Sequence, residues 1–267
     1  MINWEFNMKE QIGQSANVLF LVLDALRYDA AQHLFQEGQL PNFSNYLPST
    51  GWEKRYTPAS FTYPAHQAFF AGFLPTKVDQ EVTPRHFAAE FQGSVSTTDQ
   101  TFLFQEADVI TALSKLGYCT ACIGGVGFFN QQTAVSRILP GLFQESFWSP
   151  ALGVTDPHST QNQFHLAAQW LQSVDSPFFL YINVSAIHQP NCHYLSATSD
   201  SLESHQAALQ YVDQQLPILM HALQVKAPVC CFICSDHGTA YGEEGHWGHR
   251  NGHKTVMEVP YIDFLLT

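Results

Sequence analysis

Two acidic residues and one histidine are the side chains best suited to chemistry in this sequence. Asp24 directly follows the apolar run 17–23, and the pair Asp236-His237 closely follows the apolar run 229–233. Carboxylates and imidazoles are common ligands of divalent metal ions. A helix cap is the alternative for Asp24, because aspartate is also favoured at that position. The two segments together indicate a metal site.

Thr62 supplies a hydroxyl at a predicted helix start. It lies in Ser60-Phe-Thr-Tyr-Pro-Ala-His66, a pattern that predicts Thr62 as the N-cap and Pro64 within the first helical turn. A hydroxyl at a helix N-terminus faces unpaired N–H groups, which suits an oxyanion or a transferring phosphoryl group. An ordinary capped helix is the alternative.

Histidines are concentrated after Asp236-His237. The glycine-rich segment 242–253 contains His246, His249 and His253. Such a cluster can supply neutral imidazole ligands or donors to phosphate oxygens, and a solvated loop is the alternative. Gly238 is expected to permit a sharp turn directly after the Asp-His pair. His188 follows another apolar run, 178–184.

Buried strands that alternate with helices must position these residues. Apolar runs without alternation predict parallel strands over 17–23, 118–123, 178–184, 229–233 and 259–266. Helices are predicted over 107–113, 161–171 and 201–223, and 124–159 is expected to be irregular. This order predicts an α/β fold with a doubly wound, mostly parallel central sheet flanked by helices. Ligands bind at the carboxyl ends of such strands, where Asp24, His188 and Asp236 all lie.

Composition limits the number of domains, the partners and the location that the sequence allows. The 267 residues with 45% hydrophobic content predict one globular catalytic domain over 1–267. A net charge of -12 argues against a nucleic acid or an anionic membrane surface as the partner. The six cysteines are interpreted as reduced, mostly buried thiols. No signal peptide or membrane span is evident, so a cytoplasmic location is expected, and a homo-oligomer is compatible with the sequence.

In their order along the chain, these motifs resemble the alkaline phosphatase, nucleotide pyrophosphatase and sulfatase superfamily. The resemblance rests on an Asp after the first strand, a Thr two residues before Pro, a His after a central strand and Ser235-Asp-His-Gly238. The segment Gly242-Glu-Glu-Gly-His-Trp-Gly-His249 and the pair Val259-Pro260 are similar to the late sulfatase signature.

The resemblance implies roles for particular residues. It implies that Asp24, Asp236 and His237 hold a metal ion that the nucleophile Thr62 also touches. His188 and His253 become ligands of a second metal or contacts to the substrate anion. His249 stands where sulfatases place an anion-binding Lys, and His66, Arg27 and His246 are further expected substrate contacts. One or two divalent ions are therefore expected, and zinc or manganese best fits mixed carboxylate and imidazole ligands.

Departures from the family pattern narrow the predicted chemistry. Thr62 cannot become the formylglycine of sulfatases, and Thr-x-Pro-x-His resembles the phosphodiesterase branch instead. Val184 stands where two-metal members carry an Asp, and the sulfatase C-terminal subdomain is expected to be absent. These features predict a hydrolase of phosphate mono- or diesters that works through a phospho-Thr intermediate. The alternatives are transfer to an acceptor other than water, hydrolysis of sulfate esters, and a non-catalytic metal-binding protein. The expected substrate is a small anionic ester, with a modified peptide as one candidate.

Overall fold

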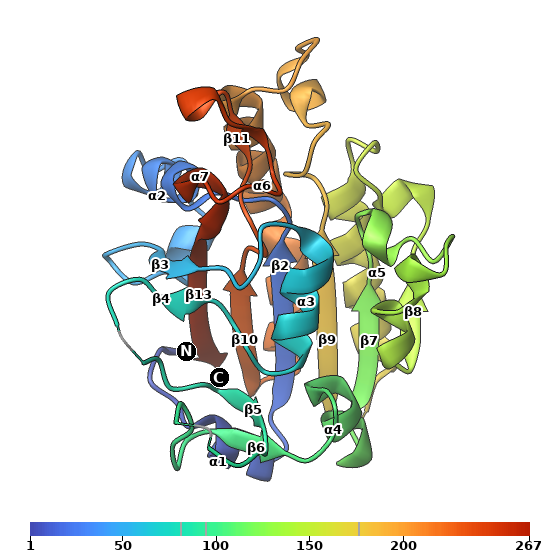
Figure 1. Ribbon diagram of the computed structural model, residues 1–267. Helices are drawn as coiled ribbons and strands as arrows, with labels where there is room; N and C mark the ends of the chain where they lie inside the picture. The colour runs from blue at the N-terminus through green and yellow to red at the C-terminus, as the bar shows by residue number, and fades with distance from the viewer. Residues whose placement is uncertain (81, 94, 176) are drawn as a thin grey trace.

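A single mixed sheet forms the centre of the protein. The computed structural model describes residues 1–80, 82–93, 95–175 and 177–267. Its strands lie in the order β4-β3-β13-β10-β2-β9-β7-β8, and β1 pairs with β13 (Figure 1). Their bounds are β1 Ile2–Asn3, β2 Asn17–Leu23, β3 Glu53–Tyr56, β4 Thr76–Lys77, β7 Cys119–Ile123, β8 Glu145–Phe147, β9 Phe178–Val184, β10 Val229–Cys234 and β13 Glu258–Leu266.

The parallel part of the sheet confirms the predicted α/β class. Strand β2 lies between β10 and β9 and runs parallel to both, and β7 and β8 continue the parallel set. Every residue of β9 and β10 is buried. Both faces of these strands are covered, which explains why their sequences are continuous apolar runs.

The predicted fifth parallel strand is wrong in its direction. Strand β13 pairs antiparallel to β10, with Cys234 opposite Tyr261. A parallel return needs a crossover connection that carries the chain back along the sheet. The connection from β10 to β13 contains only the hairpin of β11 (Ala240–Tyr241) and β12 (Trp247–Gly248) and the short helix α7 (Lys254–Met257). The chain therefore re-enters the sheet from the same end.

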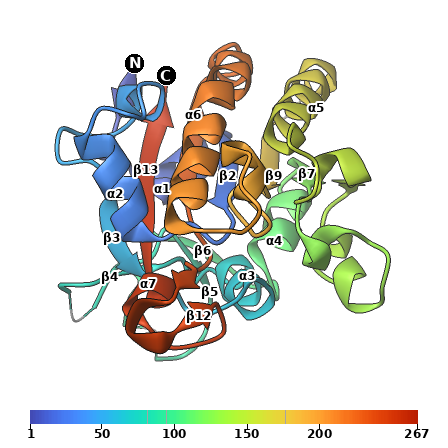
Figure 2. The same ribbon diagram turned by 90° about the horizontal axis from the view of Figure 1, so that it is seen from above.

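Two apolar layers cover the sheet, and successive residues of β2 point into opposite layers. Leu19, Leu21 and Leu23 pack with α2 (Tyr28–Gln36), α5 (Ser159–Ser173) and α6 (Leu202–Gln224). Val18, Phe20 and Val22 pack with α1 (Met8–Gly13), α3 (Thr62–Phe70) and α4 (Val109–Lys115). Figure 2 shows the first group of helices on one side of the sheet and α3 and α4 on the other.

The predicted helices are present with somewhat different ends. Helix α4 begins and ends two residues later than expected, and α5 is longer at both ends. The segment 124–159 is largely irregular, as expected, with four short 3-10 turns and β8 before α5 begins. A small parallel pair, β5 (Phe87–Ala89) with β6 (Phe102–Phe104), escaped prediction. All six cysteines are free, and four of them are buried. None of the helices in the described part of the chain is long and apolar enough to cross a membrane.

Candidate metal and nucleophile site

Two carboxylates and one imidazole meet at the carboxyl edge of β2 and β10. Because the two strands pair in parallel, with Val22 opposite Cys234, Asp24 comes close to Asp236 and His237. One ligand atom from each of these three side chains lies within 4.8 Å of the others, and all three residues are fully buried. The strand order thus assembles the predicted group from distant parts of the chain.

Each carboxylate has one oxygen held by the protein and one oxygen without a partner. Asp24 Oδ2 accepts a hydrogen bond of 2.8 Å from the Asn183 amide. Asp236 Oδ1 accepts from the backbone N–H groups of Ala25, at 3.2 Å, and His237, at 3.1 Å. Asp24 Oδ1 and Asp236 Oδ2 are buried without a hydrogen-bond partner. Buried unpaired carboxylate oxygens are costly, so this pair needs a cation or protons.

The imidazole of His237 is oriented as a metal ligand would be. Its Nδ1–H donates to the Gly238 carbonyl at 2.9 Å, which leaves Nε2 unprotonated, with a lone pair that can bind a metal ion. Nε2 lies 3.6 Å from Asp236 Oδ2 and 3.9 Å from Asp24 Oδ1. Burial lowers the pKa of His237, which keeps the ring neutral. Two orphan oxygens and one free imidazole lone pair fit a divalent ion such as zinc or manganese.

The pKa values of the carboxyl groups reflect the same crowding. Burial raises the pKa of Asp24 to about 6, and the nearby charge of Asp236 adds to this effect. Burial likewise raises the pKa of Asp236 to about 6. Two adjacent buried carboxylates disfavour each other's ionised form, and a bound cation would reverse that effect.

Thr62 lies at the start of α3 and faces the carboxylate and imidazole group. Its Oγ1 is 3.5 Å from Asp24 Oδ2 and 3.3 Å from His237 Nε2. The residue is the first of the helix, and Phe61 is the N-cap, so the predicted cap position was wrong by one residue. Phe61 has no side-chain acceptor, which leaves the Thr62 hydroxyl free to face the site instead of capping the helix.

His66 lies beneath Thr62 and not at a surface where a substrate could touch it. The ring is fully buried, and Nδ1 donates to the Thr62 carbonyl at 2.7 Å. The hydroxyl of Tyr181 bonds its Nε2. Burial lowers the pKa of His66 to about 3, so the ring is neutral. In this position His66 supports the backbone of Thr62.

Arg27 is occupied by carboxylates of the protein. The guanidinium is buried and forms ion pairs with Asp29 and Glu243. It also donates to the Thr239 carbonyl at 3.4 Å. Arg27 therefore ties the start of α2 to the hairpin that follows His237, and its charge is neutralised locally.

The remaining predicted histidines form two neighbouring sets. His249 packs against His237, with ring centroids 4.7 Å apart, and against His188, with centroids 5.6 Å apart. His246 stacks on His253 at 5.0 Å, and His253 Nε2 lies 3.7 Å from a carboxylate oxygen of Glu244. The three-residue group within 4.8 Å contains neither His188 nor His253. His249 and His188 thus border the Thr62 site, and His246 and His253 form a separate pair.

Asn183 and Tyr181 were missed by the sequence reasoning. Both lie on β9 beside β2, and Asn183 is held by the Val126 N–H, which donates to its Oδ1. The polar Asn183 inside an apolar strand, at the same edge as Asp24, was the available signal. Gly238 has a different role from the one expected, because a Cβ there would lie 1.9 Å from the Thr255 carbonyl oxygen. Its small size allows close approach of α7, and its φ lies outside the left-handed region.

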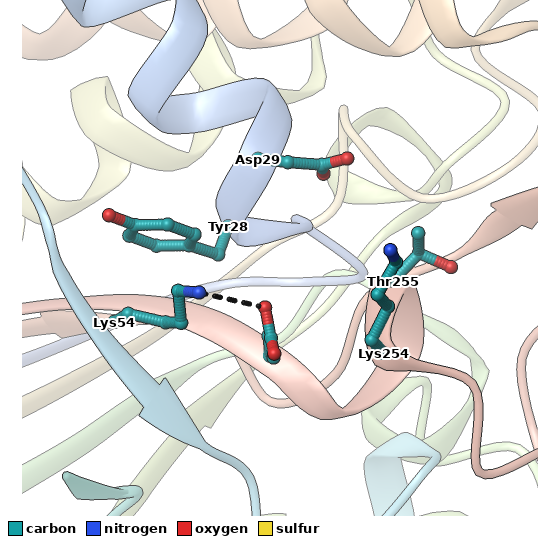
Figure 3. Close-up of a pocket in the computed structure, with 6 residues that line it drawn as sticks. Tyr28, Asp29, Lys54, Lys254 and Thr255 are labelled. Atoms are coloured by element: carbon teal, nitrogen blue, oxygen red, sulfur yellow. Dashed lines mark ion pairs between the residues drawn. The ribbon is translucent and has the colours of Figure 1, made fainter. Parts of the chain in front are cut away.

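A cavity of about 290 Å³ opens beside this site, at the start of α2 (Figure 3). Its lining residues are Tyr28, Asp29, Lys54, Lys254, Thr255 and Glu258. Lys54 pairs with Glu258 at 3.3 Å, which Figure 3 marks with a dashed line. Asp29 accepts a hydrogen bond from Arg27, and Thr255 is hydrogen-bonded to His253. The cavity therefore adjoins residues that lie next to the site, and Thr62 does not line it.

The fold and this buried Asp-Asp-His group beside a threonine hydroxyl define a member of the alkaline phosphatase superfamily. The family model described as Sulfatase matches residues 16–262. The chain therefore belongs to the sulfatase family, whose wider superfamily comprises enzymes that act on phosphate or sulfate esters. No curated protein matches the chain.

Solved structures with the same fold share little sequence with this chain. The C-terminal periplasmic domain of the phosphoethanolamine transferase EptC from Campylobacter jejuni is 13% identical, with a TM-score of 0.56; the match covers 94% of this chain and 79% of that one. The corresponding EptC domain from Escherichia coli, in complex with zinc, is 11% identical with a TM-score of 0.60, over 94% and 73% of the two chains. The lipoteichoic acid synthase LtaP from Listeria monocytogenes is 12% identical with a TM-score of 0.58, over 93% and 65%.

Proposed function

We propose that this protein is a metal-dependent hydrolase of phosphate esters with Thr62 as its nucleophile. The observation that carries the proposal is the position of Thr62 Oγ1, 3.3 Å from His237 Nε2 and 3.5 Å from Asp24 Oδ2, at the first residue of α3. A threonine hydroxyl is a competent phosphoryl acceptor when a neighbouring cation lowers its pKa. The substrate class is a small anionic mono- or diester.

Asp24, Asp236 and His237 would hold the metal ion, which when bound lowers the pKa of a coordinated hydroxyl and neutralises developing negative charge. The Thr62 hydroxyl loses its proton to solvent as Oγ attacks phosphorus, and the bond from phosphorus to the leaving oxygen breaks. That oxygen takes a proton from water or from His188, whose ring packs against that of His249 at the edge of the site. Water then attacks the phosphorus atom of the phospho-Thr, the phosphorus–Oγ bond breaks, and a proton from water restores the Thr62 hydroxyl. The released product is inorganic phosphate from a monoester and a phosphate monoester from a diester.

The first residues of α3 support the attacked group. Phe61 caps this helix without a side-chain hydrogen bond, so backbone N–H groups of the first turn remain unsatisfied near Thr62. A helix N-terminus stabilises negative charge on a transferring phosphoryl group. Asn183 holds Asp24 in place through its amide.

The test is Thr62→Ala in metal-loaded protein, assayed with a panel of aryl phosphate monoesters, phosphate diesters and sulfate esters. We expect phosphate ester turnover by the wild type and a loss of at least about 1,000-fold in the variant, because the nucleophile is removed. Metal content measured by elemental analysis should stay equal in both proteins. Turnover of sulfate esters alone, or full activity of Thr62→Ala, would contradict the proposal.

A transferase is the second candidate, and the structural relatives favour it. The EptC proteins are named as phosphoethanolamine transferases and LtaP as a lipoteichoic acid synthase. Hydrolysis in ¹⁸O-labelled water separates the two candidates. A hydrolase incorporates the label into released phosphate, whereas a transferase gives an unlabelled phosphoryl group on an added alcohol acceptor.

A further inference from the structure

Arg250 is held beside Thr62 by its own backbone. The residue is exposed and adopts the left-handed conformation, with φ of 68°, which is uncommon outside glycine. Its N–H donates a hydrogen bond of 2.9 Å to the carbonyl of Ser60, two residues before Thr62. A strained backbone residue that is fixed to the nucleophile loop indicates a placed side chain.

The side chain of Arg250 also contacts the segment that contains Thr62. Its guanidinium lies over the ring of Phe61, 5.2 Å from the centroid. Phe61 immediately precedes Thr62 and packs against Phe128, with ring centroids 6.4 Å apart. Cation–π contact with a supported ring limits where the guanidinium can lie, so Arg250 stays next to the nucleophile.

The positive charge of Arg250 is not neutralised by an acidic side chain in the described part of the chain. In residues 1–80, 82–93, 95–175 and 177–267 it takes part in no ion pair, whereas Arg27 is engaged by Asp29 and Glu243. In a chain with a net charge of -12, this unpaired charge is a specific attraction for an anion.

We propose that Arg250 is a substrate-binding residue that receives non-bridging phosphate oxygens of the ester attacked by Thr62. A guanidinium presents parallel N–H donors that match two oxygens of one phosphate group. The inference rests on the proposed function, because it needs an anionic ester at Thr62. The charge of Arg250 would also make a dianionic monoester the preferred substrate, because a doubly charged phosphate is attracted to a fixed cation more strongly than a singly charged diester is.

The experiment uses metal-loaded protein, an aryl phosphate monoester, the matching diester, and inorganic phosphate as the binding probe. Arg250→Gly removes the side chain while glycine accepts the left-handed backbone, so the variant should fold. We expect the Kd of inorganic phosphate and the KM of the monoester to rise about 10- to 100-fold, as for loss of a charged hydrogen bond. The diester should be affected less, and Arg250→Lys should recover part of the loss.

The matched control is Arg137→Ala, which removes an exposed arginine whose Nε donates to the Gln131 carbonyl within its own loop, and it should behave as wild type. Phosphate binding and monoester KM within twofold of wild type in Arg250→Gly would overturn the inference. Wild-type protein that binds no phosphate would overturn it as well. Retained turnover in Thr62→Ala contradicts the proposed function instead, and phosphate titration of Arg250→Gly by calorimetry still tests the binding residue independently of turnover.

Discussion

The imidazole of His66 joins the backbone carbonyl of Thr62 to the hydroxyl of Tyr181. A carbonyl can only accept, so the 2.7 Å bond to Thr62 fixes the hydrogen on Nδ1 and leaves Nε2 to accept from Tyr181. The ring is enclosed by aromatic side chains, including Phe69 and Phe129. This buried chain of hydrogen bonds connects β9 to the first residue of α3 and thereby fixes the position of Thr62.

Tyr181→Phe should therefore slow catalysis without changing substrate binding. The variant leaves His66 Nε2 buried without a donor, at a cost of about 1–3 kcal/mol in the free energy of unfolding. We expect kcat to fall about 10-fold through misplacement of Thr62, with KM and metal content within twofold of wild type. Steady-state kinetics and elemental analysis measure these quantities.

Tyr118→Phe is the matched control, because it also removes a buried tyrosine hydroxyl. That hydroxyl donates to the Ala16 carbonyl at 2.9 Å, just before β2 begins and so away from the strand end that carries the site. The control should lose stability and retain kcat. Equal kcat values in Tyr181→Phe and Tyr118→Phe would show that the Tyr181–His66 contact is only structural.

Metal binding should depend on pH through Asp24 and Asp236. Both folded-state pKa values are raised to about 6, from an ordinary value of 3.8. Between these pH values the folded metal-free protein binds more protons than the unfolded chain, so its stability falls as pH rises through this window. A cation that replaces those protons should raise Tm more at pH 7.5 than at pH 5. Thermal melts with a chelator and with added zinc or manganese measure this difference.

Asp24→Asn tests whether the ionised Asp24 carboxylate destabilises the metal-free protein. The amide removes a buried charge, so the metal-free variant should be more stable than metal-free wild type at pH 7.5, by about 1–3 kcal/mol. It should also lose most of the metal-dependent increase in Tm. A variant that is less stable than wild type in chelator at pH 7.5 would contradict the inferred cost of this carboxylate.

Gly238→Ala should disrupt the site through packing alone. An added Cβ would meet the Thr255 carbonyl oxygen at 1.9 Å, so either α7 or the adjacent His237 must move. We expect at least about 3 kcal/mol of destabilisation and reduced metal content, measured by denaturant unfolding and elemental analysis. Gly252→Ala is the control, because a Cβ there would meet no atom within 4 Å. Normal metal binding by Gly238→Ala would contradict the need for this close approach.

The sequence predicted the strands and the central site residues for one shared physical reason. Buried parallel strands are continuous apolar runs, and polar residues that closely follow such runs, such as Asp24 and Asp236, lie where ligands bind. Strand direction was not predictable in the same way, because a short apolar run does not show whether its strand pairs parallel or antiparallel. Side-chain partners also escaped prediction. The sequence does not distinguish the surroundings of Arg27 from those of Arg250. In the folded protein Arg27 forms an ion pair with Glu243, whereas Arg250 lies over the ring of Phe61.

The central place of β2 in the sheet has a consequence for how the protein is made. Ala25 and Asp236 touch although 211 positions separate them, and β2 cannot complete its pairing until β9 and β10 have both left the ribosome. Contacts of such long range make folding slow, and they leave β2 without its two neighbouring strands until β10 has been synthesised. In a nascent chain Asp24 and Asp236 are therefore far apart, and a metal ion that needs both carboxylates would bind only after β10 has paired with β2.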